Sequence, residues 1–267
     1  RDYRQLPLEI DPPRHHLYRS ALGPFFVKST IEKFVPQFEE NSRKLIAEYF
    51  KEDAQNAVGH LALPIVMHNL GAIFNRPQDV AEWISWGPDV WTAESEKRDG
   101  GVLHRYLDAI YEEALTKKYQ DVWSEIAHLE IEGKVISQEE FRGIAGVLLA
   151  GGRDTVVKLL TGIIWHLGNV PEDLKYLREN PTGIDNAIQE LLRFLTPLPA
   201  MARTTTPEST VTNLPDDRYV QISFISGNFD ESVFENPYAI DIKRGRIPHF
   251  RLQHIGHQIA VQELRAF

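Results

Sequence analysis

The longest regular pattern of hydrophobic residues in the chain runs from residue 144 to residue 167. Apolar side chains recur there every three or four positions, the spacing of one face of an α-helix, at Ile144, Val147, Leu148, Val156, Leu159, Leu160, Ile163, Ile164 and Leu167. Ser137 precedes this run and Glu140 follows three residues later, which is the S-x-x-E form of a capping box. The pattern predicts one long helix that crosses most of a domain.

Shorter stretches with the same spacing predict helices along most of the remaining chain. They begin near Arg14, cover 27–50 with an interruption at Pro36, cover 61–74, 77–86, 103–114 and 184–194, and start again at Pro171 and near His254. Residues 219–225 instead alternate apolar and polar side chains, which predicts a strand. The fold class is therefore mainly α with a small β-sheet region. Because no repeat, low-complexity tract or clear linker interrupts residues 1–267, we expect a single domain.

Composition and charge exclude several classes of function. The 267 residues are 42% hydrophobic and 25% charged, with a formal net charge of −9 and no basic stripe, so we expect no nucleic-acid partner. No apolar run approaches the roughly 20 residues that span a bilayer, so we expect no membrane partner and a cytoplasmic location. Cysteine is absent, which excludes disulfides and any cysteine nucleophile or thiolate ligand from this polypeptide.

A few polar residues stand out against the hydrophobic pattern. Two glycines and a threonine interrupt the long helix within residues 150–155, where they cost helix stability unless a bend or a close approach requires them. His15 and Arg19 are four residues apart, and Glu190 and Arg193 three apart, so each pair shares a helix face. Taken alone, each of these features has an ordinary structural interpretation, such as a solvated pair on the surface.

Taken in order, however, the segments around these residues resemble one family. The segments are DPPRHHLYR at 11–19, AGGRDT at 150–155, ELLR at 190–193, MARTTT at 201–206, NFDESVFENP at 228–237, PHF at 248–250 and IGHQIAVQEL at 255–264. They resemble the haem-thiolate monooxygenases of the cytochrome P450 superfamily, in particular its soluble bacterial members. The resemblance runs through nearly the whole chain and implies the cytochrome P450 fold. Because family members usually extend beyond both ends of the sequence, we expect a fold truncated at both ends.

The resemblance also implies haem as the cofactor and assigns residues to its propionates. His15, Arg19, Arg203 and His249 would meet a propionate, because a buried carboxylate needs charged or hydrogen-bonding partners. Gly151 would let the helix backbone approach the cofactor closely.

Two further pairs of residues receive roles from the same resemblance. Glu190 and Arg193 would form a structural ion pair behind the haem, where a buried pair affects architecture more than net stability. Asp154 and Thr155 would be the catalytic acid and alcohol beside bound dioxygen.

The sequence departs from the family at the iron ligand. His254 occupies the position of the ligand cysteine, and about five loop residues, including glycines, are missing between it and His249. Imidazole binds haem iron in other proteins, so His254 is the candidate metal ligand and His257 the second candidate. An imidazole would not push electron density as a thiolate does, which disfavours cleavage of the O–O bond.

Three hypotheses follow, and they leave open whether the chain is an enzyme. The first is a haem-binding oxidoreductase, monooxygenase-type or peroxidase-like, that acts on a hydrophobic small molecule near Leu148, Leu149 and Pro199. As a monooxygenase it would need ferredoxin and ferredoxin reductase. The second is a haem-free auxiliary protein that activates a partner glycosyltransferase, as some cysteine-lacking members of the superfamily do. The third is an ordinary family enzyme whose cysteine-bearing segment is missing from the sequence.

Overall fold

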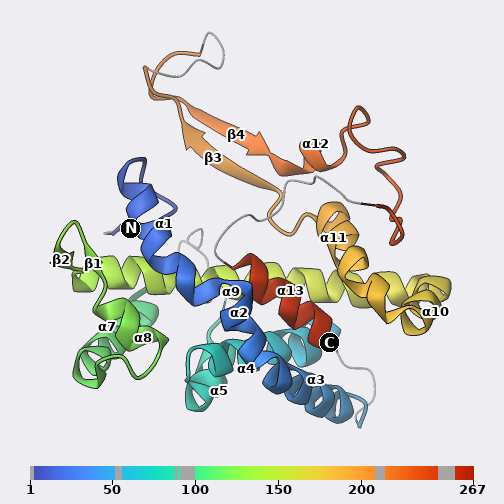
Figure 1. Ribbon diagram of the computed structural model, residues 1–267, viewed down its shortest axis with the longest axis horizontal. Coiled ribbons are helices and arrows are strands. Elements are labelled where there is room, and N and C mark those ends of the chain that lie inside the picture. The colour runs from blue at the N-terminus through green and yellow to red at the C-terminus, as the bar shows by residue number, and fades with distance from the viewer. Residues whose placement is uncertain (1–2, 52–55, 88–89, 91–99, 208–213, 246–255) are drawn as a thin grey trace. The chain divides into compact units, whose positions relative to one another are not determined.

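Helices dominate the computed structural model, which describes residues 3–51, 56–87, 90, 100–207, 214–245 and 256–267 (Figure 1). Within these ranges the strands form two antiparallel sheets of two strands each. The predicted fold class, mainly α with a small β-sheet region, is confirmed. The chain divides into two compact units, one comprising Arg1–Thr161 with His254–Phe267 and the other Gly162–Gln253.

The first unit is almost entirely helical. Its helices are α1 (Arg14–Leu22), α2 (Lys28–Ile31), α3 (Val35–Tyr49), α4 (Leu63–Ile73), α5 (Val80–Ser85), α7 (Gly100–Lys117), α8 (Val122–Ala127), the first part of α9 (Gln138–Asn169) and α13 (His257–Ala266). Short 3-10 turns at Gly23–Phe26, Glu32–Phe34 and Pro77–Asp79 and a π-helical turn at Val58–Ala62 connect them. Pro36, which we expected to interrupt a helix, stands in the first turn of α3, where its missing N–H breaks no bond.

Aromatic rings fill the core of this unit. Phe74 at the end of α4 stacks on Trp123 of α8 with 4.3 Å between ring centroids, and Phe141 of α9 meets Trp123 edge-on at 5.8 Å. The last helix, α13, packs against α2 and α3 (Figure 1). A hairpin of β1 (Glu130–Ile131) and β2 (Lys134–Val135) precedes α9. Two residues per strand are too few to show an alternating pattern, so the sequence did not predict this hairpin.

The start of α9 confirms the predicted capping box. The Ser137 hydroxyl accepts from the Glu140 N–H at 3.2 Å, and the Glu140 carboxylate accepts from the Ser137 N–H at 2.8 Å. Glu140 also accepts a short hydrogen bond from the Tyr18 hydroxyl and so ties α1 to α9. Burial, together with this carboxylate, raises the pKa of Tyr18 to about 12. The cap therefore fixes both where α9 begins and where α1 lies.

The second unit combines short helices with a β-ribbon. It contains the rest of α9, α10 (Pro171–Glu179), α11 (Ile184–Leu195), β3 (Ala200–Thr204), β4 (Tyr219–Ser223) and α12 (Phe224–Asn228). The predicted strand over 219–225 is two residues too long. The Ser223 hydroxyl accepts from the Ser226 N–H at 3.2 Å and caps α12, so Phe224 and Ile225 are helical although they continue the alternation.

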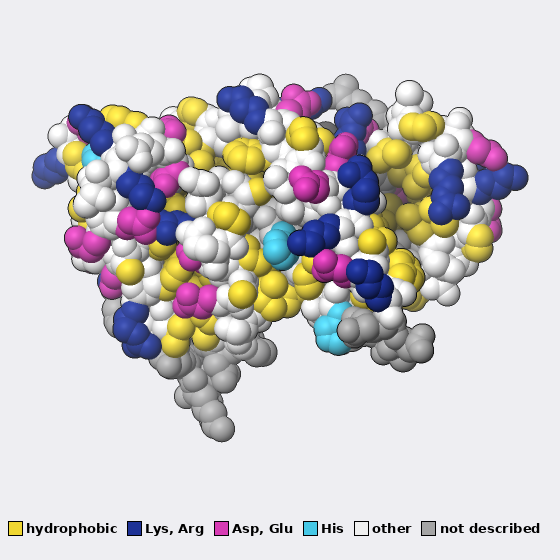
Figure 2. Space-filling view, turned by 90° about the horizontal axis from the view of Figure 1, so that it is seen from below, with side chains coloured by type: hydrophobic (Ala, Val, Ile, Leu, Met, Phe, Trp, Pro, Cys, Tyr) yellow, Lys and Arg dark blue, Asp and Glu magenta, His cyan; other side chains and the backbone are white. Residues whose placement is uncertain are grey.

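The surface mixes charges of both signs. On the face drawn in Figure 2, lysine and arginine side chains lie among aspartates and glutamates, and hydrophobic side chains occupy the space between them. Of the helices in the described ranges, none combines the length and the apolar composition needed to cross a bilayer.

Candidate functional site

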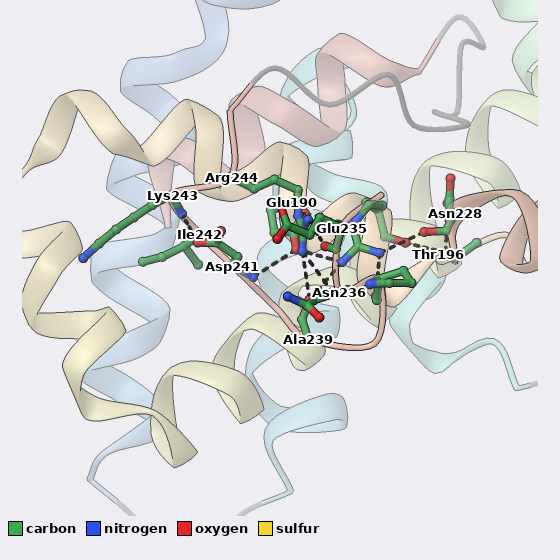
Figure 3. A network of polar contacts seen from close by, with 12 residues as sticks. Glu190, Thr196, Asn228, Glu235, Asn236, Ala239, Asp241, Ile242, Lys243 and Arg244 are labelled. Carbon is green, nitrogen blue, oxygen red and sulfur yellow. Dashed lines mark hydrogen bonds and ion pairs between the residues drawn. The ribbon is translucent and has the colours of Figure 1, made fainter. Parts of the chain in front are cut away.

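A buried ion pair lies on α11 in the second unit. Glu190 and Arg193 lie one turn apart, and both side chains are fully excluded from solvent. Arg193 donates from Nε to one carboxylate oxygen at 2.9 Å and from Nη2 to the other at 2.8 Å, a bidentate arrangement. Figure 3 shows Glu190 within this network of polar contacts. The i, i+3 spacing in the sequence thus corresponds to a direct contact in the structure.

The remaining donors of Arg193 bind the loop that follows α12. Nη1 donates to the carbonyl oxygens of Asn228 at 2.8 Å and Pro237 at 2.9 Å, and Nη2 donates to that of Ala239 at 3.1 Å. These bonds fix the path of residues 228–239 over α11. Arg193, the last residue of the ELLR segment, therefore binds both ends of the segment NFDESVFENP.

Arg244 completes this network and was not foreseen from the sequence. Its Nε donates to Glu190 at 3.1 Å, and its other nitrogens donate to the carbonyl oxygens of Glu235, Asn236 and Ala239. Glu190 also accepts from the Asp241 N–H at 3.0 Å. Burial raises the pKa of Glu190, but these donors together outweigh burial and hold the pKa below its ordinary value. Glu190 is therefore ionised.

Thr196 joins the end of α11 to the same network. It caps the helix with φ of 38°, in the left-handed region that a β-branched residue rarely adopts. Its buried hydroxyl donates to the Arg193 carbonyl at 2.6 Å and accepts from the Asn228 amide at 3.0 Å. These two bonds stabilise the unfavourable backbone conformation and hold α12 against α11.

The glycine-containing middle of α9 lies in the first unit and remains helical. The Thr155 hydroxyl donates to the Gly151 carbonyl one turn earlier at 2.8 Å. A Cβ on Gly152 would come within 2.9 Å of the buried Leu70 of α4, whereas a Cβ on Gly151 would meet only open space. Gly152 therefore serves helix packing, and Gly151 leaves a free surface on α9. The Asp154 carboxylate forms a short ion pair with Arg153.

Of the four residues assigned to propionates, three lie within the described ranges. His15 and Arg19 are half-buried on α1, and the His15 ring meets the His16 ring edge-on at 5.4 Å between centroids. Arg203 lies on β3. His249 falls outside the described residues, as does the candidate ligand His254.

The β-ribbon places Arg203 among apolar side chains. The register pairs Arg203 with Val220 and Met201 with Ile222, so these four side chains share one face of the sheet. Ile222 is exposed, as is Arg203 itself. Among the residues that the structure describes, no carboxylate pairs with Arg203, and its Nη1 donates to the Ala202 carbonyl at 2.7 Å. An exposed cation on an apolar face suits a ligand that is apolar and carries a carboxylate.

Comparisons of sequence show relatives of one kind. No family model matches the chain. Putative cytochrome P450 YjiB of Bacillus subtilis is 25% identical over 263 residues, which are 92% of this chain and 66% of the relative. The erythromycin C-12 hydroxylase of Saccharopolyspora erythraea is 27% identical over 250 residues, with 88% and 62% covered. The chain thus spans about two thirds of the length of the curated relatives it matches.

Comparisons of structure agree with those of sequence. A mutant of P450 EryK in complex with erythromycin B is 25% identical, with a TM-score of 0.84 over 97% of this chain and 71% of that chain. A structure described as that of a carbohydrate-active P450 is 31% identical, covers all of this chain and 72% of the other, and has a TM-score of 0.88. On this similarity in sequence and fold, the chain belongs to the cytochrome P450 family.

Proposed function

We propose that this chain is the haem-binding part of an oxidoreductase that acts on a hydrophobic small molecule. Haem is the cofactor of the family to which the chain belongs. The observation that carries the proposal is Arg203, an exposed guanidinium without a carboxylate partner among the described residues, on a ribbon face shared with Met201, Val220 and Ile222. Haem has the matching chemistry, because it is a flat apolar group with two carboxylates.

The donors that the chain offers fit the propionates but not thiolate ligation. Arg203, His15 and Arg19 can pair with carboxylates, and we assign them, with His249, to the propionates. A thiolate ligand cannot come from this polypeptide because it contains no cysteine. We therefore assign the iron to the imidazole of His254.

Haem, when bound, supplies an iron centre at which an oxidant is activated. The chain's own residues would donate and accept protons at this site. We assign this role to Asp154 and Thr155, which follow each other on α9. Asp154 is half-exposed and paired with Arg153, so it can exchange protons with water. The Thr155 hydroxyl is oriented by its bond to the Gly151 carbonyl.

Leu148, half-buried on the same helix, is the candidate for contact with the substrate, whereas Leu149 is fully buried in the core.

A spectroscopic titration tests the proposal. Purified protein titrated with haem should develop a Soret band at one equivalent, with imidazole rather than thiolate character after reduction and addition of carbon monoxide. His254→Ala should abolish the band or change its ligation signature. His60→Ala, which removes an exposed histidine from the π-helical turn, is the control and should bind haem normally. Protein that takes up no haem would exclude the function.

Turnover separates the two kinds of oxidoreductase. With imidazole ligation we expect peroxide-dependent oxidation of an apolar dye and weak activity with ferredoxin, ferredoxin reductase and dioxygen, because imidazole donates less electron density to the iron than thiolate. Efficient hydroxylation supported by ferredoxin would contradict ligation by His254. It would show that a cysteine-bearing segment completes the protein, and an intact mass above that of the 267 residues would confirm this.

The absence of cysteine favours a second candidate function. A chain of this fold without a thiolate can serve as a haem-free auxiliary protein that activates a partner glycosyltransferase. We then expect co-purification with the transferase and transferase activity that depends on this chain. Arg203→Ala distinguishes the candidates: it should weaken haem uptake in the first case and leave activation of the transferase unchanged in the second.

A further inference from the structure

A carboxyl group is buried on the last helix, with no charged partner in the described part of the chain. Glu263 of α13 is only 2% exposed, and neither carboxyl oxygen has a hydrogen-bond partner among the described residues. Burial raises the pKa of this carboxyl well above its ordinary value, and the nearby amide of Asn69 opposes the shift without cancelling it. An ionised carboxylate here would lose its hydration with no cation to replace it. Burial therefore favours the protonated form of this group.

The polar neighbours of Glu263 come from two other helices. Asn69 of α4 is fully buried and accepts a hydrogen bond from the Asn41 amide of α3 at 2.9 Å. This bond uses Asn69 Oδ1 and leaves Asn69 Nδ2 without a partner within the described part of the chain. Asn69 Nδ2 is close enough to Glu263 to favour its charged form, although the pair does not reach hydrogen-bond geometry. A small side-chain rotation would complete the row from Asn41 through Asn69 to Glu263.

Among the residues that the structure describes, no charged group on the neighbouring elements compensates the burial of Glu263. The charged residues of α2 and α3, the helices against which α13 packs, are exposed: Lys28, Glu39, Glu40, Arg43, Lys44 and Glu48. In the turn between them, Glu32 and Lys33 are exposed as well. On α4, His68 is half-buried, and burial lowers its pKa. On α13 itself, Arg265 is exposed and His257 is half-buried.

We propose that Glu263 is a neutral carboxylic acid that docks α13 onto α4 and α3 through Asn69 and Asn41, and that its ionisation releases α13. A neutral acid offers a carbonyl oxygen to Asn69 Nδ2. Because both side chains are buried, water does not compete for this hydrogen bond as it would at the surface. The helix α13 begins at His257, three residues after the candidate ligand His254 in the sequence (Figure 1). Glu263 is therefore a positioning residue for the helix that follows this ligand. The groups that dock α13 in this way, Glu263, Asn69 and Asn41, all belong to the chain itself.

Infrared spectroscopy tests the protonation state directly. At neutral pH the wild-type protein should show the carbonyl stretch of one buried, protonated carboxylic acid. Glu263→Gln should remove this band. Glu39→Gln, which changes an exposed carboxylate of α3, is the matched control and should leave the band unchanged. A wild-type spectrum without the band would overturn the proposal.

The pH dependence of stability tests the docking. Below the ordinary range of glutamate, both the folded and the unfolded state are protonated, and the full stability is present. As pH rises, the unfolded state ionises first, so the unfolding equilibrium constant should increase by up to about tenfold per pH unit until the folded state also ionises. The protection factors of the α13 amides, in which the intrinsic rise of the exchange rate with pH is divided out, should fall over the same window. Both trends should disappear in Glu263→Gln and persist in Glu39→Gln.

A titration of the wild-type protein alone keeps the proposal testable if Glu263→Gln does not fold. The infrared band should then vanish with rising pH in step with a fall in the protection factors of the α13 amides. Loss of the band with unchanged protection factors in α13 would show that ionisation of Glu263 does not control α13.

Discussion

Arg193 uses every N–H of its guanidinium inside the protein. The five donors make two bonds to Glu190 and three to the carbonyl oxygens of Asn228, Pro237 and Ala239. Because every N–H donor of the guanidinium has an acceptor, these bonds offset the loss of hydration of the buried cation. The arginine therefore orders the loop after α12 as well as pairing with the acid, and a lysine, with a single nitrogen and three donors, could not do both.

Replacement of this arginine tests its role in architecture. We expect Arg193→Lys to lower the free energy of unfolding by about 3–5 kcal/mol, because it removes the bidentate pairing with Glu190 and leaves buried carbonyl oxygens of the loop without donors. Urea unfolding followed by circular dichroism measures the change. Lys175→Ala is the control, since it removes only an exposed i, i+4 pair with Glu179 and should cost no more than about 1 kcal/mol. Equal losses of stability in the two variants would show that the Arg193 network does not stabilise the fold.

Arg244 gives a prediction with a pH signature. Arg244→Met removes one donor from Glu190 but leaves both bonds from Arg193, so we expect a loss of only about 1–3 kcal/mol at neutral pH. The lowered pKa of Glu190 means that its contribution is present above the ordinary glutamate range and is lost as pH falls through the folded-state pKa. With one donor fewer, this loss should begin at a higher pH. Acid unfolding monitored by tryptophan fluorescence would show the midpoint moving up. A midpoint unchanged from wild type would show that Arg244 does not act on Glu190.

The sequence predicts only the local part of this network. Three residues separate Glu190 from Arg193, so their contact follows from helix geometry. The other partners are 35 to 46 residues away from Arg193, and their positions depend on the path of a loop without periodicity. Arg244 was missed for the same reason. The buried acid Glu263 was missed because its position in α13 gives no sign that Asn69 of α4 lies opposite.

At the scale of elements, α9 shows what a hydrophobic pattern can and cannot predict. Its periodicity and its capping box predicted a single long helix, and the structure has one from Gln138 to Asn169. The pattern did not distinguish the two glycines at its centre, because that distinction depends on which helix crosses α9 there. Gly152 meets Leu70 of α4, whereas Gly151 faces open space.

The two glycines make a matched pair for an experiment. We expect Gly151→Ala to raise the free energy of unfolding by about 0.5–1 kcal/mol, because alanine favours a helix and its Cβ meets no neighbour. Gly152→Ala should instead destabilise by about 1–3 kcal/mol, because its Cβ would overlap a fully buried leucine. Thermal unfolding measures both. If Gly151 permits close approach of haem, Gly151→Ala should also weaken haem uptake while it stabilises the protein. Unchanged uptake would remove Gly151 from the cofactor site.

At the scale of the whole molecule, family membership and the chemistry of the iron site rest on different evidence. The fold and the Glu190–Arg193 network are features of residues that the structure describes, and relatives cover them along 88–100% of this chain. The first candidate ligand, His254, lies outside the described ranges, and the sequence contains no cysteine that could take its place. Similarity in fold therefore establishes the family, while the activity has to be tested at the ligand position.

Replacement of His254 by cysteine is the sharpest test of the ligand position. If residue 254 reaches the iron, the reduced carbon monoxide complex should change from imidazole-type to thiolate-type absorbance in His254→Cys, because the residue at this position sets the electron density on the metal. Activity supported by ferredoxin should rise in the same variant, since a thiolate favours cleavage of the O–O bond. His257→Cys, three residues further on at the start of α13, is the matched control and should keep the wild-type spectrum. A thiolate signature in His257→Cys alone would move the ligand to position 257. An unchanged spectrum in both variants would mean that neither residue reaches the iron, and the shortened turn would then favour the haem-free auxiliary function.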